Sequence, residues 1–281
     1  MKIVHTIADV RHAMSEAGVV GKTVGLVPTM GALHEGHMAL VRCARQDNGL
    51  VAVSIFVNPT QFAPSEDLAK YPRTLEADAQ KCREAGVDLI FAPGAEEMYP
   101  DGFDSGVEVG GVTEMLEGES RPTHFRGVAT VCLKLFNIFQ PDRAYFGQKD
   151  YQQLCAIRKM VRDLNVPLEI VPIDIVREQD GLAMSSRNRY LNADERTAAL
   201  ALSRSLAAVK SAAVEGEASP DAIERVIRAI LDSEPLAGIE YGVVVDAETL
   251  LPIDSMDRPA VILLAVRIGS TRLIDNMLLS P

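Results

Sequence analysis

Cysteine is scarce in this sequence, and long apolar runs are absent. The four cysteines, Cys43, Cys82, Cys132 and Cys155, are widely spaced and form no Cys-x-x-Cys pair. This spacing argues against a disulfide scaffold and against a zinc site, and it fits a reducing cytoplasm. No run approaches the roughly 18 apolar residues of a membrane helix, and the opening MKIVHTIADV lacks the apolar core of a signal peptide.

A surplus of positive charge is also missing. Lys and Arg number 28 against 39 Asp and Glu, so the formal net charge is −11. Nucleic-acid-binding proteins usually present a basic face, so we expect no nucleic-acid partner. No G-x-G-x-x-G motif follows a predicted strand, which argues against a dinucleotide-dependent oxidoreductase. With 281 residues and 47% hydrophobic side chains, the chain can bury a large core, and we expect a soluble cytoplasmic protein of one or two domains.

Apolar runs typical of buried parallel strands alternate with segments of helical periodicity up to about residue 176. The predicted strands span residues 23–27, 50–57, 87–92, 143–146 and 168–176, and the predicted helices span 35–46, 73–85, 128–139 and 151–164. A short strand is also expected at 107–109 and a short helix at 113–118. This order predicts the fold class α/β, with a doubly wound, Rossmann-like parallel sheet.

The pattern changes beyond Arg187. A long alanine-rich helix is predicted at 193–215 and another at 220–232, with Ser219 as its N-cap. Short strands at 239–245, 260–266 and 272–274 follow, and helices before clustered strands predict a smaller C-terminal α+β domain. We therefore place one domain at residues 1–176 and a second at 177–281.

The stretch PTMGALHEGH, residues 28–37, lies between a predicted strand and a predicted helix. His34 and His37 are nearly one helical turn apart, so both rings should leave the helix start on the same side. Helix starts carry unpaired N–H groups and a positive dipole end, which favour phosphate. Gly31 and Gly36 allow a nucleotide to approach the backbone closely. This corner predicts a polyphosphate site.

Other interpretations of the two histidines remain open at this point. A zinc site needs three or four ligands, and no nearby Cys or His pair supplies the others. The rings could also be ordinary surface histidines at a helix start. A metalloprotease helix is excluded, because HExxH requires a spacing of four residues.

Three further polar segments follow predicted strands. The loop beginning Asn58-Pro59-Thr60-Gln61 lies where a strand opens into a ligand-binding edge, although it could be a simple turn. Gly147-Gln148-Lys149-Asp150 forms a second strand–loop–helix corner, although a lone lysine in a turn is usually solvated. Met184-Ser185-Ser186-Arg187 offers two hydroxyls and an arginine suited to phosphate, although Ser-Ser-Arg alone is a weak signal. Residues 121–127, with two arginines and a histidine, predict a loop.

PTMGALHEGH resembles the nucleotide-binding corner of the HxGH nucleotidyltransferases, and its sequence is most similar to that of the pantothenate synthetase (pantoate–β-alanine ligase) family. The resemblance extends along nearly the whole chain, through VSIFVNPTQF, DLAKYPRTLEAD, MLEGESRPTHFRGV, YFGQKDYQQL, DGLAMSSRNRYL and RLIDN. Several motifs in one order are far more specific than any one of them.

The resemblance implies an enzyme that ligates pantoate and β-alanine through pantoyl adenylate, with ATP as substrate, Mg²⁺ beside it, and a homodimeric, cytoplasmic form. The second domain would close over the ATP site. The catalytic residues implied are His34, His37, Lys149, Ser185, Ser186 and Arg187. The ATP-binding residues implied are Met30, Gly31, Ala32, Leu33, His34, Glu35, Gly36, His37, Gly147, Gln148, Lys149, Asp150, Val176, Met184, Ser185, Ser186 and Arg187. Pantoate would be held by Gln61 and Gln153, with Asn58 nearby.

The resemblance is incomplete at the residues expected to contact Mg²⁺. On the helix after YPRT, only Asp78 fits the carboxylates that some family members use as metal contacts. Two other functions stay open: a related nucleotidyltransferase that acts on another acceptor, and a non-catalytic adenine-nucleotide-binding protein. A tRNA-charging enzyme is disfavoured by the negative net charge.

Overall fold

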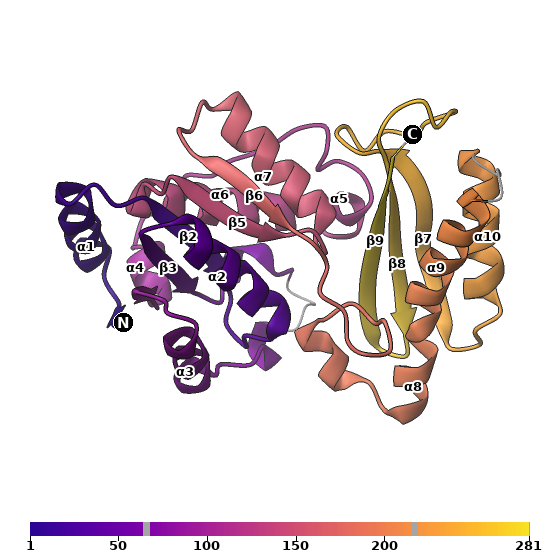
Figure 1. The fold of residues 1–281 in the computed structure, drawn as a ribbon, viewed down its shortest axis with the longest axis horizontal. Coiled ribbons are helices and arrows are strands. Elements are labelled where there is room, and N and C mark those ends of the chain that lie inside the picture. Colours follow the sequence, from indigo (N-terminus) through magenta and orange to yellow (C-terminus); the bar gives the residue numbers. More distant parts are fainter. Residues whose placement is uncertain (64–67, 215–218, 281) are drawn as a thin grey trace. The chain divides into compact units, whose positions relative to one another are not determined.

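The computed structural model describes residues 1–63, 68–214 and 219–280. The chain divides into two compact units (Figure 1). The first comprises Met1–Gln148 and Ala156–Asp174, and the second comprises Lys149–Cys155 and Ile175–Pro281. Among the described residues, no helix is both long and apolar enough to cross a membrane.

The first unit is built on a six-stranded sheet in which every neighbouring pair is parallel. Residues 24–27 and 51–54 are buried, as expected for the apolar runs of strands that are covered on both faces. In spatial order the strands are β1 Lys2–Val4, β4 Leu89–Phe91, β3 Leu50–Ile55, β2 Val24–Thr29, β5 Arg143–Gly147 and β6 Glu169–Ile173.

Helices cover both faces of this sheet (Figure 1). Helix α2 (Glu35–Asp47) packs on β2, β3 and β5 and contacts α3 (Leu75–Glu84). Helices α1 (Ile7–Val19) and α6 (His124–Phe139) contact each other, and α6 packs on β2. Right-handed crossovers place these two pairs on opposite faces. The helices are α1 Ile7–Val19, α2 Glu35–Asp47, α3 Leu75–Glu84, α4 Ala95–Met98, α5 Glu117–Ser120, α6 His124–Phe139 and α7 Tyr151–Asp163, with short 3₁₀ turns η1 Pro59–Gln61 and η2 Leu68–Lys70.

The strand order reverses between β2 and β5. The chain steps from β2 through β3 to β4 on one side and from β5 to β6 on the other. Because β2 and β5 are hydrogen-bonded and parallel, the segments that follow Thr29 and Gly147 leave the same edge of the sheet. Ligands of open α/β sheets bind at such a switch point.

The second unit carries an antiparallel sheet with β8 in the centre: β7 Ala237–Asp246, β8 Ala260–Ile268 and β9 Thr271–Leu279. Every β8 residue except Arg267 is buried. Helix α10 (Pro220–Asp232) packs on β7 and on α9 (Leu200–Val214), and α8 (Ala193–Ala198) precedes α9. The predicted fold class, α/β with a smaller C-terminal α+β part, is confirmed.

Most predicted elements are present, and the agreement is best where a cap marks the end. Helix 220–232 has its predicted bounds, and Ser219 accepts a hydrogen bond from the Ala222 N–H. The strand predicted at 272–274 is longer, because β9 pairs with β8 along its whole length. Strand β1 and helix α1 were not predicted.

Some details of the prediction are wrong. Residues 107–109 form no strand, because the Val107 N–H donates to the Thr130 hydroxyl on α6 and to no strand partner. The helix expected at 113–118 begins only at Glu117, since Leu116 has a φ of 55°. The predicted loop 121–127 is cut short by α6, which begins at His124.

The prediction of one long helix at 193–215 is also wrong, because residues 193–198 and 200–214 form two separate helices. The Ala199 N–H still bonds to the Glu195 carbonyl, but the Leu202 N–H turns to the Ala199 carbonyl, three residues back. This tighter turn separates α8 from α9. The predicted end at Glu215 lies outside the described residues.

Candidate active site

The loop between β2 and α2 begins with a tight turn. Gly31 has a φ of 86°, and a side chain there would come within 3.1 Å of the Ile55 side chain and 3.2 Å of Asp78. Ala32 also has a positive φ, 50°, which non-glycine residues rarely adopt. Such a conformation persists only where neighbouring groups hold it.

Helix α3 holds this turn. Asp78, only 1% exposed, accepts hydrogen bonds from the Ala32 N–H at 2.9 Å and the Leu33 N–H at 2.8 Å. The Thr74 hydroxyl donates to the same carboxylate at 3.0 Å, and the Lys81 ammonium donates to the Leu33 carbonyl. Asp78 therefore fixes the backbone that leads into α2.

The hydrogen bonds of Asp78 decide whether its carboxylate can be a ligand of Mg²⁺. Both of its carboxylate oxygens are buried and engaged with N–H and O–H donors, so they do not fit the coordination of Mg²⁺. In the part of the chain that the structure describes, no group of three or more His, Cys, Asp or Glu side chains is arranged to hold a metal ion. A zinc site at the two histidines is likewise unsupported there.

His34 and His37 form the start of α2, where the sequence placed them. The His34 ring caps the helix, because its Nδ1 accepts from the Gly36 N–H at 3.1 Å. The His37 Nδ1 accepts in turn from the His34 N–H at 3.3 Å, and the two ring centroids are 4.1 Å apart. Because each Nδ1 is an acceptor, each neutral ring carries its proton on Nε2. Both imidazoles are thus held as Nε2–H donors.

Asn58 follows β3 and caps the 3₁₀ turn η1, and Gln61 is the last residue of that turn. Asn58 is 1% exposed, and its Nδ2 donates to the Gln61 Oε1 at 3.0 Å and to the Gly127 carbonyl at 3.2 Å. Its Oδ1 accepts from the Tyr99 hydroxyl at 2.7 Å and from the Thr60 hydroxyl at 2.9 Å. The Asn58 amide is therefore committed to the protein interior, and it positions Gln61.

The Gln61 side chain keeps a donor in a weak interaction. Its Nε2 lies 3.2 Å from the thioether sulfur of Met30, a poor acceptor that a carboxylate or hydroxyl could replace. The backbone carbonyl oxygen of Gln61 is 2.9 Å from the His124 Nδ1 on α6. A side chain on Gly127 would lie 2.4 Å from the Thr60 carbonyl, so this glycine lets α6 pack directly on η1.

Tyr99 was not predicted as a site residue. Its hydroxyl reaches Asn58, and burial raises the pKa of the phenol, so it remains a protonated donor. The Lys134 ammonium lies 5.7 Å from the centre of the Tyr99 ring and 4.6 Å from that of Phe103. No spacing pattern in the sequence connects Tyr99 with Asn58, 41 positions away.

The second predicted corner is divided between the units. Gly147 and Gln148 belong to the first unit, where the Gln148 N–H bonds to the Ile173 carbonyl at 2.8 Å. Lys149 belongs to the second unit, where its carbonyl accepts from the Asn276 Nδ2 at 2.8 Å. Asp150 begins α7 by accepting from the Leu154 N–H, and Gln153 lies half-buried in the first turn.

The Met184–Arg187 motif follows a short hairpin in the second unit. The hairpin pairs Arg177 with Ala183, and the Met184 N–H bonds to the Val176 carbonyl at 2.9 Å. Ser185 then caps the 3₁₀ helix η3 (Ser186–Tyr190) by accepting from the Arg187 N–H at 3.2 Å. The side chains of residues 184–187 are all half-buried.

The predicted site residues thus form one set in each unit. The first unit holds Met30, Gly31, Ala32, Leu33, His34, Glu35, Gly36, His37, Asn58, Gln61, Gly147 and Gln148. The second unit holds Lys149, Asp150, Gln153, Val176, Met184, Ser185, Ser186 and Arg187.

A parallel sheet with a switch point, followed by two Nε2–H imidazoles at a capped helix start, defines an α/β nucleotide-binding protein of the HxGH type. The sequence profile described as pantoate-beta-alanine ligase matches residues 2–278. The chain belongs to this family.

Individual relatives agree. The chain is 53% identical over 279 residues to a pantothenate synthetase of Moorella thermoacetica, covering 99% of both chains. The crystal structure of pantothenate synthetase from Thermus thermophilus matches it with a TM-score of 0.95 and 48% identity over 100% of both chains. The pantoate-beta-alanine ligase from Francisella tularensis, complexed with beta-gamma ATP and beta-alanine, matches with a TM-score of 0.80 and 33% identity, covering 99% of this chain and 97% of that one.

The family match confirms two expectations from the sequence. The chain is an enzyme, an ATP-dependent ligase of pantoate and β-alanine. The alternative of a related nucleotidyltransferase with a different acceptor is not supported.

Proposed function

We propose that this ligase works in two steps on one bound nucleotide. In the first, a carboxylate oxygen of pantoate attacks the α-phosphorus of ATP, the bond from that phosphorus to the bridging oxygen breaks, and pyrophosphate leaves. In the second, the amine of β-alanine attacks the acyl carbon of pantoyl adenylate, AMP leaves, and one proton is released. The fixed Nε2–H tautomers of His34 and His37 carry this proposal, in a chain that matches the ligase family along nearly its whole length.

The first step brings two anions together, so donors must offset the charge that grows on the phosphates. His34 and His37 donate hydrogen bonds from Nε2 to the triphosphate, and the His37 Nε2–H stabilises the negative charge on the oxygen that leaves with pyrophosphate. Lys149 lies against the bridge between the α- and β-phosphates. Ser185, Ser186 and Arg187 bind the β- and γ-phosphates, and the hydroxyl proton of Ser185 stays available because its oxygen already accepts from Arg187.

Pantoate is held by neutral amides. Gln61 exchanges its weak contact with the Met30 sulfur for an oxygen of pantoate, and Gln153 provides a second amide. Amides bind carboxylate and hydroxyl groups without adding charge to a site that already holds ATP. Asn58 and Tyr99 act on pantoate through Gln61 only.

Magnesium enters as the Mg²⁺ complex of ATP. The buried carboxylate of Asp78 already accepts from the loop backbone, so it would not bind this ion, which would supply positive charge to the phosphates. The free cysteines of the described chain agree with a reducing cytoplasm. The homodimer rests on the family resemblance, and light scattering in solution tests it.

The test of the overall reaction is a coupled assay of AMP release. We expect AMP only when ATP, pantoate and β-alanine are all present, with multiple turnovers. AMP release at the same rate with another small carboxylate in place of pantoate would favour the other nucleotidyltransferases. Tight ATP binding without turnover would favour the non-catalytic interpretation.

A further inference from the structure

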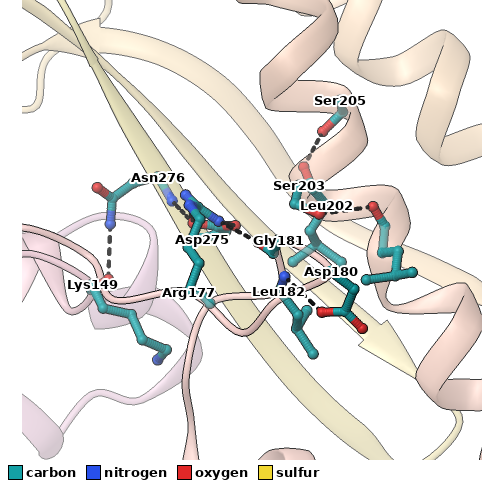
Figure 2. Close-up of polar contacts among 12 residues, drawn as sticks. Lys149, Arg177, Asp180, Gly181, Leu182, Leu202, Ser203, Ser205, Asp275 and Asn276 are labelled. Carbon is teal, nitrogen blue, oxygen red and sulfur yellow. Dashed lines mark hydrogen bonds and ion pairs between the residues drawn. The ribbon is translucent and has the colours of Figure 1, made fainter. Parts of the chain in front are cut away.

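Two consecutive residues of β9 contact Lys149 and Arg177, and Arg177 belongs to the hairpin that precedes residues 184–187 (Figure 2). We propose that Asp275 and Asn276 are positioning residues, which hold Lys149 and residues 185–187 at the spacing that the triphosphate requires. This inference rests on the proposed function, because it assumes that those segments bind phosphate.

Asn276 fixes the lysine. It is 2% exposed, and its Nδ2 donates to the Lys149 carbonyl at 2.8 Å. The same short segment of chain is held again at Tyr151, whose hydroxyl donates to the Ala247 carbonyl at 2.9 Å. A lysine side chain is long and flexible, so the direction in which its ammonium can act depends on where the backbone is held.

Asp275 fixes the hairpin. Its two carboxylate oxygens receive the Arg177 guanidinium at 2.7 and 2.9 Å, and the carboxylate is almost completely buried. Arg177 donates further to the Gly181 carbonyl at 3.0 Å, across the turn of the hairpin. Residues 184–187 continue directly from this hairpin, so its orientation determines where Ser185 and Ser186 begin.

The two anchors share one rigid support. The Asn276 N–H donates to the Asp275 Oδ1 at 2.8 Å, and β9 pairs at both residues with β8, the buried central strand. Displacing a catalytic group by about 1 Å can lower turnover by about 10²-fold. A support common to Lys149 and to the hairpin that precedes the serines therefore fixes the spacing between them.

The experiment is a double-mutant cycle on pantoate-dependent exchange of pyrophosphate into ATP. Asn276→Ala, Lys149→Ala and the double variant are compared with wild type, and Arg267→Gln is the matched control, because it breaks an ion pair with Glu240 on the same sheet. We expect Asn276→Ala to lower kcat about tenfold with the KM for pantoate unchanged. In the Lys149→Ala background, the Asn276 substitution should add little.

A second variant covers the case in which Asn276→Ala fails to fold. Arg177→Lys keeps the charge beside Asp275 but loses the two-pronged guanidinium geometry. We expect a lower kcat at a melting temperature close to that of Arg267→Gln.

The outcomes separate the two proposals. Wild-type exchange by Lys149→Ala would remove Lys149 from the proposed function. If Lys149→Ala is impaired but folded Asn276→Ala or Arg177→Lys has wild-type kcat, the positioning role is wrong. Full multiplication of the single effects in the double variant would also overturn it, since Asn276 would then not act through Lys149.

Discussion

The His37 ring accepts a hydrogen bond from the backbone N–H of His34, the residue whose own ring caps the same helix. The two imidazoles therefore have two duties, which belong to different nitrogens. Nδ1 satisfies a backbone donor that would otherwise be unpaired at the helix start, and Nε2 carries the proton. Substitutions that imitate one nitrogen at a time can separate stability from chemistry.

His37→Asn keeps an acceptor near the position of Nδ1 and removes the Nε2–H donor. We expect a melting temperature near that of wild type and a fall in kcat of about 10²-fold, the usual effect of losing one preorganised transition-state donor. His37→Gln is the comparison variant, because its longer side chain places an amide N–H donor farther from the backbone than Asn does. We expect it to retain more activity than His37→Asn. A collapse in thermal stability of His37→Asn with kcat preserved would indicate a structural histidine.

Asp78→Asn tests whether this carboxylate holds the loop or a metal. The amide would face the Ala32 and Leu33 N–H groups with one acceptor fewer, so we expect unfolding by denaturant to require about 2–3 kcal/mol less free energy without any Mg²⁺ present. The Mg²⁺ concentration needed for half-maximal activity should stay unchanged. Unaltered stability with a higher Mg²⁺ requirement would instead identify Asp78 as a ligand.

Tyr99→Phe removes the hydroxyl that donates to the buried Asn58 Oδ1. Because Asn58 orients Gln61, we expect the KM for pantoate to rise about tenfold, which corresponds to about 1.4 kcal/mol. The KM for ATP serves as the internal control and should not change. Equal rises in the KM for pantoate and the KM for ATP would show that Tyr99 stabilises the whole site and has no specific effect on Gln61.

Arg196→Met tests the ion pairs that Arg196 makes with Glu178 at 2.8 Å and with Asp180 at 2.6 Å, in the hairpin before Met184. A hydrogen bond from Arg196 holds the pKa of Asp180 below its usual value. The resulting stabilisation is complete above the unfolded-state pKa of about 4 and is lost as the pH falls through the lower folded-state pKa. We expect the variant to be less stable at neutral pH and to lose less of its stability on acidification. Parallel pH profiles of wild type and variant, measured by thermal unfolding, would contradict this.

The sequence predicted those features that are local in the chain. The α2 start at His34, the Ser219 cap and the buried run of β3 follow from capping chemistry and periodicity within a few residues. The family resemblance added the enzyme class, because it depends on many motifs in order.

The features that sequence reasoning missed are contacts between distant residues. Asp78 reaches the Ala32 N–H across 46 positions, and Asn276 reaches the Lys149 carbonyl across 127. A buried acidic or amide side chain whose partner is a backbone group leaves no residue-type pattern at the partner position. The break between α8 and α9 is similar, since alanine-rich sequence gives no sign of a tightened turn.

The most direct measurement is the exchange of labelled pyrophosphate into ATP without β-alanine. If the enzyme makes pantoyl adenylate before the amine takes part, exchange will require pantoate, proceed in the complete absence of β-alanine, and fall by about 10²-fold in both His37→Asn and Lys149→Ala. Exchange that requires β-alanine, or that proceeds at the wild-type rate in both variants, would contradict the two-step reaction at this site.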